Sequence, residues 1–280
     1  MTSSSISGTA NAMAPSTPRT TWDDLPHDVR DAITQKTDTV HRIEPITSGL
    51  NSSFAARIDT TTGPIFLKGT RSERATAARR EAQINPLVTG LSPRLRWELE
   101  TSGWHLLAFD HLDGHRADYT PGSADLPLLT TTLTKLATIT APPTARNVTD
   151  RWSDAAQRAG VDPEVFAGDR LLHTDLNPHN ILIVDGLAYL VDWSWPSQGA
   201  PWIDTASVAL WLIAEGHTPH DAEAWALSSP TWNRVAPAEV SAFTAAQSSL
   251  WEEIADADPQ PWKQRLHAAA QTWHSYRHTL

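Results

Sequence analysis

The amino-acid sequence predicts an α+β protein of two lobes, a small five-stranded antiparallel lobe with one main helix and a larger, mostly helical lobe. Three observations support this prediction. Short stretches that alternate apolar and polar residues dominate up to residue 109, and long stretches of helical character dominate after residue 123. Between them lies a run of turn-forming residues. The length of 280 residues suffices for two such lobes.

The small lobe is expected over residues 21–109. Residues 1–20 are rich in Ser, Thr and Pro and predict a disordered tail. Asp23 or Asp24 is expected to cap a helix that runs to about Gln35, with Pro26 in its first turn. The main helix is predicted at 71–84, which contains no Gly or Pro. Strand patterns occur at 40–47, 53–59, 65–68, 94–100 and 104–109.

Residues 110–123 read DHLDGHRADYTPGS and predict a hinge or linker, because this stretch is rich in turn formers. The large lobe follows over 124–280. Its only predicted strands form a hairpin, 181–184 and 187–191, with Asp185 and Gly186 in the turn. Helices are predicted at 124–138, 145–159, 203–214, 221–227, 237–255 and 261–277.

Composition excludes several classes of protein. The chain has no Cys, which excludes disulfides, thiolate zinc sites and a cysteine nucleophile. Its 22 Lys and Arg against 32 Asp and Glu argue against a nucleic-acid partner. No apolar run approaches the roughly 18 residues that span a bilayer. We therefore expect a soluble, cytoplasmic protein, a monomer or weak dimer, without a membrane partner.

The most specific pattern is LLHTDLNPHNILIVDGLAYLVDW at 171–193. It places Asp175 and Asn180 on one loop and Asp192 just beyond the predicted hairpin. A carboxylate and an amide facing a second carboxylate form an oxygen-rich pocket that suits Mg²⁺ and leaves one group to act as a base.

His173, Asp175 and Asn180 match the pattern His-x-Asp-x-x-x-x-Asn, and Asp192-Trp193 matches the usual metal-binding Asp-Trp. In these residues the chain resembles the aminoglycoside phosphotransferase family, the antibiotic-kinase branch of the protein-kinase-like fold. The resemblance implies that Asp175 is the catalytic base and that His173 braces the loop. It also implies that Asn180 and Asp192 hold Mg²⁺.

The same resemblance assigns a structural role to Asp204, which would tie the helix that follows it to the catalytic loop. The loop differs from the common sequence of the family at two positions. Asn177 stands where His is frequent, and His179 stands where Gly is frequent. Neither change removes a ligand, but His179 adds bulk beside the expected metal.

The resemblance extends to a nucleotide site for ATP or GTP in the small lobe. Lys68 at the end of a strand would pair with a helix glutamate, Glu81 rather than Glu73, and position the phosphates. Glu81 shares a helix face with the apolar Ala77 and Ile84. The turn at 47–53 would cover the phosphates, and the segment LLAFDHLDG resembles the hinge that meets the purine. The implied nucleotide contacts are Gly49, Asn51, Ser52, Lys68, Glu81, Phe109, Asp110 and Leu112.

Charge points to a cationic substrate. Residues 1–105 carry 12 basic and 11 acidic side chains, a net of +1, whereas 106–280 carry 10 and 21, a net of -11. Such an acidic lobe would attract a polycation. Glu215 stands where aminoglycoside kinases place a substrate carboxylate, and Glu252, Glu253 and Asp256 form a second acidic run. A solvated acidic face explains any single one of these carboxylates equally well.

The sequence thus predicts an ATP-dependent kinase that phosphorylates a hydroxyl of a small molecule, an aminoglycoside antibiotic in the first place. The alternatives are a kinase for a macrolide, a peptide antibiotic, hydroxyurea, choline or a metabolite, and a catalytically silent nucleotide-binding module. Intact Lys68, Asp175, Asn180 and Asp192 argue against the silent module. Only 11 residues separate Asp192 from Asp204, too few for the activation segment of a protein kinase.

Overall fold

A computed structural model describes residues 19–46 and 52–279. These residues pack as two compact units, each built from two separate stretches of chain. The first, here the sheet unit, consists of the described residues up to 117 together with 178–196. The second, here the helical unit, consists of 118–177 and 197–279. Most of the predicted tail, residues 1–18, lies outside the described residues.

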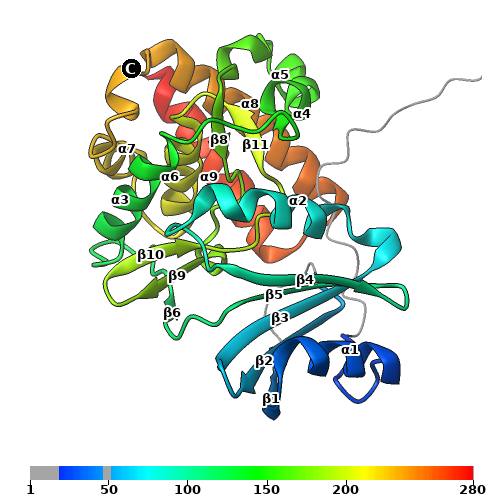
Figure 1. The fold of residues 1–280 in the computed structure, drawn as a ribbon. Helices are drawn as coiled ribbons and strands as arrows, with labels where there is room; N and C mark the ends of the chain where they lie inside the picture. Colours follow the sequence, from blue (N-terminus) through cyan, green and yellow to red (C-terminus); the bar gives the residue numbers. More distant parts are fainter. Residues whose placement is uncertain (1–18, 47–51, 280) are drawn as a thin grey trace, which may run out of the picture. The chain divides into compact units, whose positions relative to one another are not determined.

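The sheet unit contains the predicted five-stranded antiparallel sheet, which is confirmed (Figure 1). Its strands lie in the order β1-β2-β3-β5-β4, so that β5 inserts between β3 and β4. Their bounds are β1 Val40–Pro45, β2 Phe54–Thr60, β3 Gly63–Arg71, β4 Leu95–Thr101 and β5 Trp104–Asp110.

The two faces of this sheet carry different helices, α1 (His27–Thr37) and α2 (Thr76–Ile84) (Figure 1). Side chains alternate between the faces because successive residues of a strand point in opposite directions. Leu106 and Ala108 therefore join α1 in one apolar cluster, whereas Leu107 and Phe109 join α2 in another. Both faces of the sheet are thus covered.

The predicted start of the first helix is wrong. Pro26, not Asp23 or Asp24, is the N-cap residue, and no side chain caps the helix. The pyrrolidine ring of Pro26 disfavours a helical conformation at Leu25, so the helix begins beyond the proline. Asp24 instead accepts a hydrogen bond from Thr21 Oγ1 at 2.6 Å.

The main helix of the sheet unit is shorter than predicted. Strand β3 extends to Arg71, whose guanidinium lies 4.3 Å from the centre of the Trp104 ring. Residues Ser72–Arg74 form a 3₁₀ turn, and α2 begins only at Thr76. The cross-strand pairing of Arg71 with Trp104 thus extends the strand through residues whose composition favours a helix.

The predicted hairpin is confirmed as β9 (Ile181–Val184) and β10 (Leu187–Leu190). Asp185 and Gly186 both adopt positive φ, 49° and 74°, as a tight two-residue hairpin turn requires. A third strand, β6 (His115–Arg116), pairs with β9 inside the stretch predicted as a linker. The adjoining Gly114 permits this approach, since a Cβ atom there would lie 2.2 Å from the carbonyl oxygen of Ile183.

The helical unit holds a small sheet that the sequence did not predict. Its strands are β7 (Arg146–Asn147), β11 (Ser197–Gly199) and β8 (Arg170–Leu172), in that order. The helix predicted at 145–159 is therefore divided into β7, α4 (Val148–Arg151) and α5 (Ser153–Arg158). Strands of two or three residues carry no measurable periodicity, and only their distant pairing partners define them.

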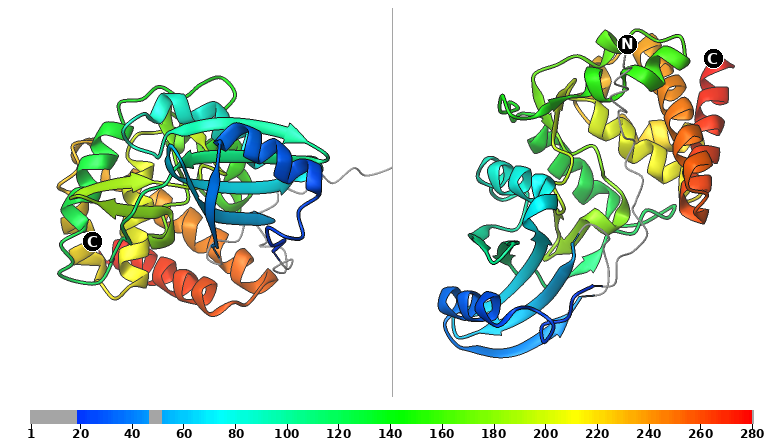
Figure 2. Two further views of the ribbon diagram at one scale, coloured as in Figure 1. Left: turned by 60° about the horizontal axis from the view of Figure 1, so that its bottom comes forward. Right: turned by 90° about the vertical axis from the view of Figure 1, so that its right-hand side faces the viewer.

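The remaining predicted helices are confirmed to within a few residues. Helix α6 is buried on nearly all sides, and α8 and α9 pack against each other (Figure 2). Phe243 on α8 packs edge-on against Trp273 on α9 and against Phe166. No described helix is both long and apolar enough to cross a membrane. The bounds are α3 Leu126–Leu136, α6 Ile203–Ala214, α7 Pro219–Ala226, α8 Pro237–Ala257 and α9 Pro261–His278.

Candidate functional site

The sheet unit contains a buried lysine, Lys68, that contacts acidic side chains. Lys68 lies on β3 and points to the face that α2 covers, where its ammonium forms an ion pair with Glu81. The two side chains are 12% and 6% exposed, so water screens this pair little. Glu73, the alternative partner, lies in the exposed 3₁₀ turn before α2. The helix thus presents Glu81 to the lysine.

A second carboxylate approaches the same lysine. Asp192 Oδ1 lies 3.7 Å from Lys68 Nζ, which also lies 5.7 Å from the centre of the Phe109 ring. Burial alone would lower the pKa of Lys68, but Glu81 and Asp192 outweigh burial and raise it. The lysine is therefore held as a cation between two carboxylates.

Asn180 directly precedes β9 and Asp192 follows β10, so the two residues flank the hairpin in the sequence. The backbone N–H of Val191 donates to the carbonyl oxygen of Asn180 at 2.9 Å, which closes the hairpin beside Asp192. Asp192 has a φ of 63°, unusual for a residue with a Cβ atom. Its carboxylate accepts a hydrogen bond from Ser194 Oγ. The hairpin thus fixes the backbone at both candidate metal ligands.

The residue types at these positions fit Mg²⁺, which prefers oxygen ligands and is often held by one or two carboxylates plus substrate phosphates. Asn180 offers an amide oxygen and Asp192 a carboxylate. Across residues 19–46 and 52–279, no group of three or more His, Asp or Glu side chains is placed to bind a metal ion.

The helical unit contains the first half of the loop, His173 to Asn177. His173 is fully buried, and its Nδ1 accepts a hydrogen bond from the backbone N–H of Asp175 at 3.3 Å. The Asp175 carboxylate accepts a hydrogen bond from Asn177 Nδ2 at 2.9 Å. Tyr119 donates its hydroxyl to the carbonyl of Leu176 at 3.1 Å. These bonds give Asp175 a defined conformation.

Asp204 anchors this loop to α6. Its two carboxylate oxygens accept the backbone N–H groups of His173 and Thr174 at 2.8 and 2.9 Å. Burial raises the pKa of Asp204, and the two N–H donors offset part of that effect. Thr174 has a φ of 62°, a strained conformation for a β-branched residue. The bonds to Asp204 help to hold it there.

The candidate hinge residues differ in their surroundings. Phe109 is buried in the cluster under α2. Asp110 ends β5, and its backbone N–H donates to Arg94 O at 2.9 Å. Leu112 is half-buried, as is Ser52, the one phosphate-turn candidate that the structure describes. The other two, Gly49 and Asn51, lie outside the described residues.

The candidate substrate carboxylates lie in the helical unit. Glu215 follows the last residue of α6, and its carboxylate is 4.0 Å from Arg265 Nη2. Glu252, Glu253 and Asp256 are exposed on α8. Glu253 forms an ion pair with Arg158, which partly neutralises its charge. The three carboxylates are therefore not equally available to a cationic substrate.

No protein-family model matches this chain, and no curated protein matches its sequence. Solved structures do match it. The choline kinase LicA from Streptococcus pneumoniae is 13% identical with a TM-score of 0.62, over 89% of this chain and 99% of that chain. An aminoglycoside phosphotransferase from Alicyclobacillus acidocaldarius is 14% identical with a TM-score of 0.62, over 91% and 96%. The chain has the protein-kinase-like fold of these enzymes.

A third structure with this kinase-like fold is that of the aminoglycoside phosphotransferase APH(4)-Ia, a thermostable mutant in a ternary complex with ADP and hygromycin B. It is 15% identical with a TM-score of 0.57, over 88% of this chain and 98% of that chain. The fold predicted from the motif at 171–193 is therefore confirmed, and the likeness extends through both units.

The kinase-like fold also brings two arginines to the loop that sequence reasoning missed. Arg116 on β6 donates to the carbonyl of His179 at 2.5 Å, within the sheet unit. Arg151 on α4 donates to Thr174 Oγ1 at 2.7 Å, within the helical unit. Neither arginine belongs to a recognisable motif. Only the pairing of β6 with β9, and the short helix after β7, bring them to the loop.

Proposed function

We propose that this chain is an ATP-dependent phosphotransferase that phosphorylates a hydroxyl of a small cationic molecule of the aminoglycoside type. The observation that carries this proposal is the buried cation Lys68 between Glu81 and Asp192. A buried ionic group is costly and weak evidence for stability. A lysine held in this way is well suited to nucleotide phosphates, and the kinase-like fold supports that role.

The proposed roles follow the family resemblance residue by residue. Lys68 contacts the nucleotide phosphates, with Glu81 fixing its position, and Asn180 and Asp192 hold Mg²⁺. The ion, when bound, offsets phosphate charge. Asp175 accepts the proton of the substrate hydroxyl while the hydroxyl oxygen forms a bond to the γ-phosphorus of ATP. The bond between the γ-phosphorus and the oxygen that leaves with ADP breaks at the same time. ADP and the phosphorylated product are then released.

The proposed nucleotide contacts rest on the same resemblance. Gly49, Asn51 and Ser52 would contact phosphate, Phe109 would lie behind the purine, and Asp110 and Leu112 would meet its edge through backbone atoms. Two relatives were solved with adenine nucleotides, LicA with AMP and APH(4)-Ia with ADP. These complexes support ATP as the phosphate donor, and GTP is the alternative that competition would reveal.

Charge supports a cationic substrate. Residues 106–280 carry a net charge of -11, from 10 basic and 21 acidic side chains. Glu215, Glu252 and Asp256 are the carboxylates proposed to meet ammonium groups. Choline and aminoglycosides are both cations, and they are the substrates that the names of the structural relatives imply. Choline is therefore the first competitor to test against an aminoglycoside.

The test is a panel assay that couples ADP release to candidate substrates, followed by a variant of the active one. Asp175→Asn should lower kcat by about 10²-fold or more, the usual scale for a positioned acid or base. Its affinity for ATP and its melting temperature should remain near those of the wild type. Asp150→Asn, an exposed change in the helical unit, is the control. Wild-type turnover in folded Asp175→Asn would refute the proposed mechanism.

A second experiment tests the substrate class. Attraction between ammonium groups and carboxylates is screened over about 10 Å at 0.1 M salt, so the substrate KM should rise with added KCl. Glu215→Gln should raise that KM with little change in kcat, because it removes binding common to ground and transition states. A KM that responds neither to salt nor to Glu215→Gln would refute a polycationic substrate while leaving the kinase assignment intact.

A further inference from the structure

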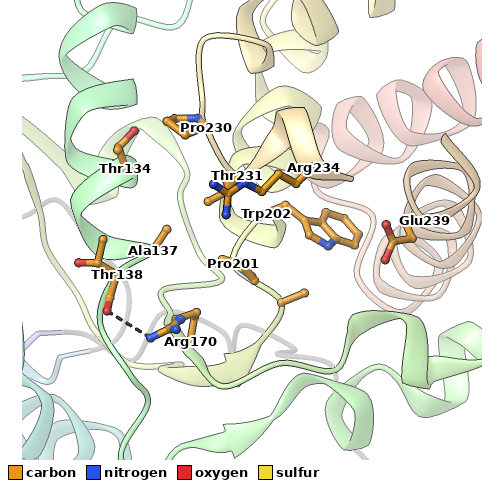
Figure 3. A pocket seen from close by; sticks show the side chains of 11 residues that line it. Thr134, Ala137, Thr138, Arg170, Pro201, Trp202, Pro230, Thr231, Arg234 and Glu239 are labelled. Carbon is orange, nitrogen blue, oxygen red and sulfur yellow. Dashed lines mark hydrogen bonds between the residues drawn. The ribbon is translucent and has the colours of Figure 1, made fainter. Parts of the chain in front are cut away.

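The helical unit contains a pocket with a volume of about 560 Å³ (Figure 3). Its wall is formed by the end of α3, Arg170 at the start of β8, residues 200–202 before α6, residues 230–234, and Glu239 near the start of α8. None of the candidate kinase residues that the structure describes lines it. A volume between about 300 and 1,000 Å³ is typical of small-molecule sites.

The wall of the pocket combines apolar surface with positive charge. Ala137, Pro201 and Trp202 form apolar parts of it, and Arg170 and Arg234 lie on either side of Pro201 in Figure 3. Their guanidinium groups carry charge at any physiological pH. Arginine side chains beside apolar surface favour an anion that has an apolar body.

The two arginines differ in how far other side chains already bind their guanidinium groups. Arg170 donates to Thr140 Oγ1 at 3.1 Å and forms an ion pair with Asp169 at 3.2 Å, so its orientation is fixed. Arg234 is exposed and forms no ion pair or side-chain hydrogen bond within the described part of the chain. Among the described residues that line this pocket, Glu239 is the one with a carboxylate, which accepts the backbone N–H of Ala236 at 2.7 Å. It caps α8, whereas Asp169 is the carboxylate that pairs with Arg170.

Two residues of the pocket wall also line a smaller void beside Asp204. A narrow void with no room for a water molecule is lined by Asp204 and shares Ala137 and Pro201 with the pocket. Asp204 in turn holds the backbone N–H groups of His173 and Thr174. Pro201 stands three residues before Asp204 in the chain, so a restraint on Pro201 reaches the anchor of the loop through the backbone at the start of α6.

We propose that this pocket binds a small organic carboxylate with an apolar body, and that its occupant restrains the backbone at residues 173–174. The carboxylate pairs with Arg234 and Arg170, while the apolar body packs on Pro201 and Trp202. With Pro201 immobilised, the start of α6 moves less and Asp204 keeps its two N–H bonds more of the time. The site is thus regulatory, and its binding chemistry does not depend on the proposed phosphotransfer.

The test uses the full chain and 1-naphthaleneacetate as the probe, with calorimetry as the measurement. We expect saturable binding at one site, and binding at least about tenfold weaker for the uncharged 1-naphthaleneacetamide. Arg234→Gln should weaken probe binding about tenfold, and Ala137→Trp should abolish it by filling the pocket. Lys135→Gln, an exposed change on α3 that does not line the pocket, is the matched control and should bind as the wild type.

Amide hydrogen exchange tests the restraint. Saturating probe should slow exchange at His173 and Thr174 about threefold or more in the wild type and in Lys135→Gln, but not in Arg234→Gln at the same probe concentration. Absence of saturable binding, or binding that ignores both Arg234→Gln and Ala137→Trp, would overturn the site. Binding without slower exchange at His173 and Thr174 would overturn the regulatory role. Neither measurement requires turnover, so failure here is separable from failure of the kinase proposal.

Discussion

Replacement of Asp204 should destabilise the helical unit by an amount that the structure allows to be estimated. The carboxylate accepts two backbone N–H groups, from His173 and Thr174, and is only 3% exposed. A hydrogen bond to a charged group contributes about 1.5–3 kcal/mol. Asp204→Ala removes both bonds and should lower the free energy of unfolding by about 3–6 kcal/mol. Asp204→Asn keeps one acceptor oxygen and should cost about 2 kcal/mol.

Thermal unfolding monitored by circular dichroism at pH 8 measures this effect. For a protein of this size, 2 kcal/mol corresponds to a fall in Tm of about 4–8 °C. Asp150→Asn replaces an exposed aspartate in the same unit and should change stability by less than about 0.5 kcal/mol. If Asp204→Asn melts with the Asp150→Asn control, the carboxylate does not anchor the loop in the way described.

Two further predictions concern the sheet unit. Lys68→Met should lower the free energy of unfolding by about 3–5 kcal/mol in urea titrations, because it leaves Glu81 buried without a cation. Adding Glu81→Leu to this variant should restore much of the lost stability. Equal stability of wild type and Lys68→Met would contradict the buried ion pair. Burial opposes ionisation of Asp110, but hydrogen bonds from Arg96 and Arg94 outweigh it and lower its pKa. Asp110 therefore stabilises the fold above its ordinary pKa and loses this effect as the pH falls through the lowered value. Urea midpoints should accordingly be lower in Asp110→Asn than in wild type at pH 6 and converge with it in acid, and a gap independent of pH would contradict the assignment.

The sequence predicts those features of the fold that local chemistry determines. Asp185 and Gly186 tolerate positive φ, so this pair of residues is enough to predict the β9–β10 turn. Helix spacing favoured Glu81 over Glu73 beside Lys68, and the structure pairs Lys68 with Glu81. Features defined by distant partners were not predictable. Strand β6 exists only because β9 lies beside it.

The same distinction applies to the candidate site. His173, Asp175 and Asn180 stand in one short stretch of sequence, where their spacing is visible. Arg116 and Arg151 reach that stretch from remote parts of the chain, through strand pairing and helix placement. The pocket beside Arg170 likewise has no sequence pattern, because five separate segments form its wall.

The division of each unit into two stretches of chain has a consequence for biosynthesis. The hairpin that supplies Asp192 belongs to the sheet unit but follows residues 118–177 of the helical unit in the sequence. Lys68 and Glu81 therefore leave the ribosome well before the carboxylate that completes their charge arrangement. Neither unit can be exchanged between genes as one continuous segment. Gene fragments that end near residue 117 should therefore yield a five-stranded sheet without β9 and β10, and without the pairing that defines β6.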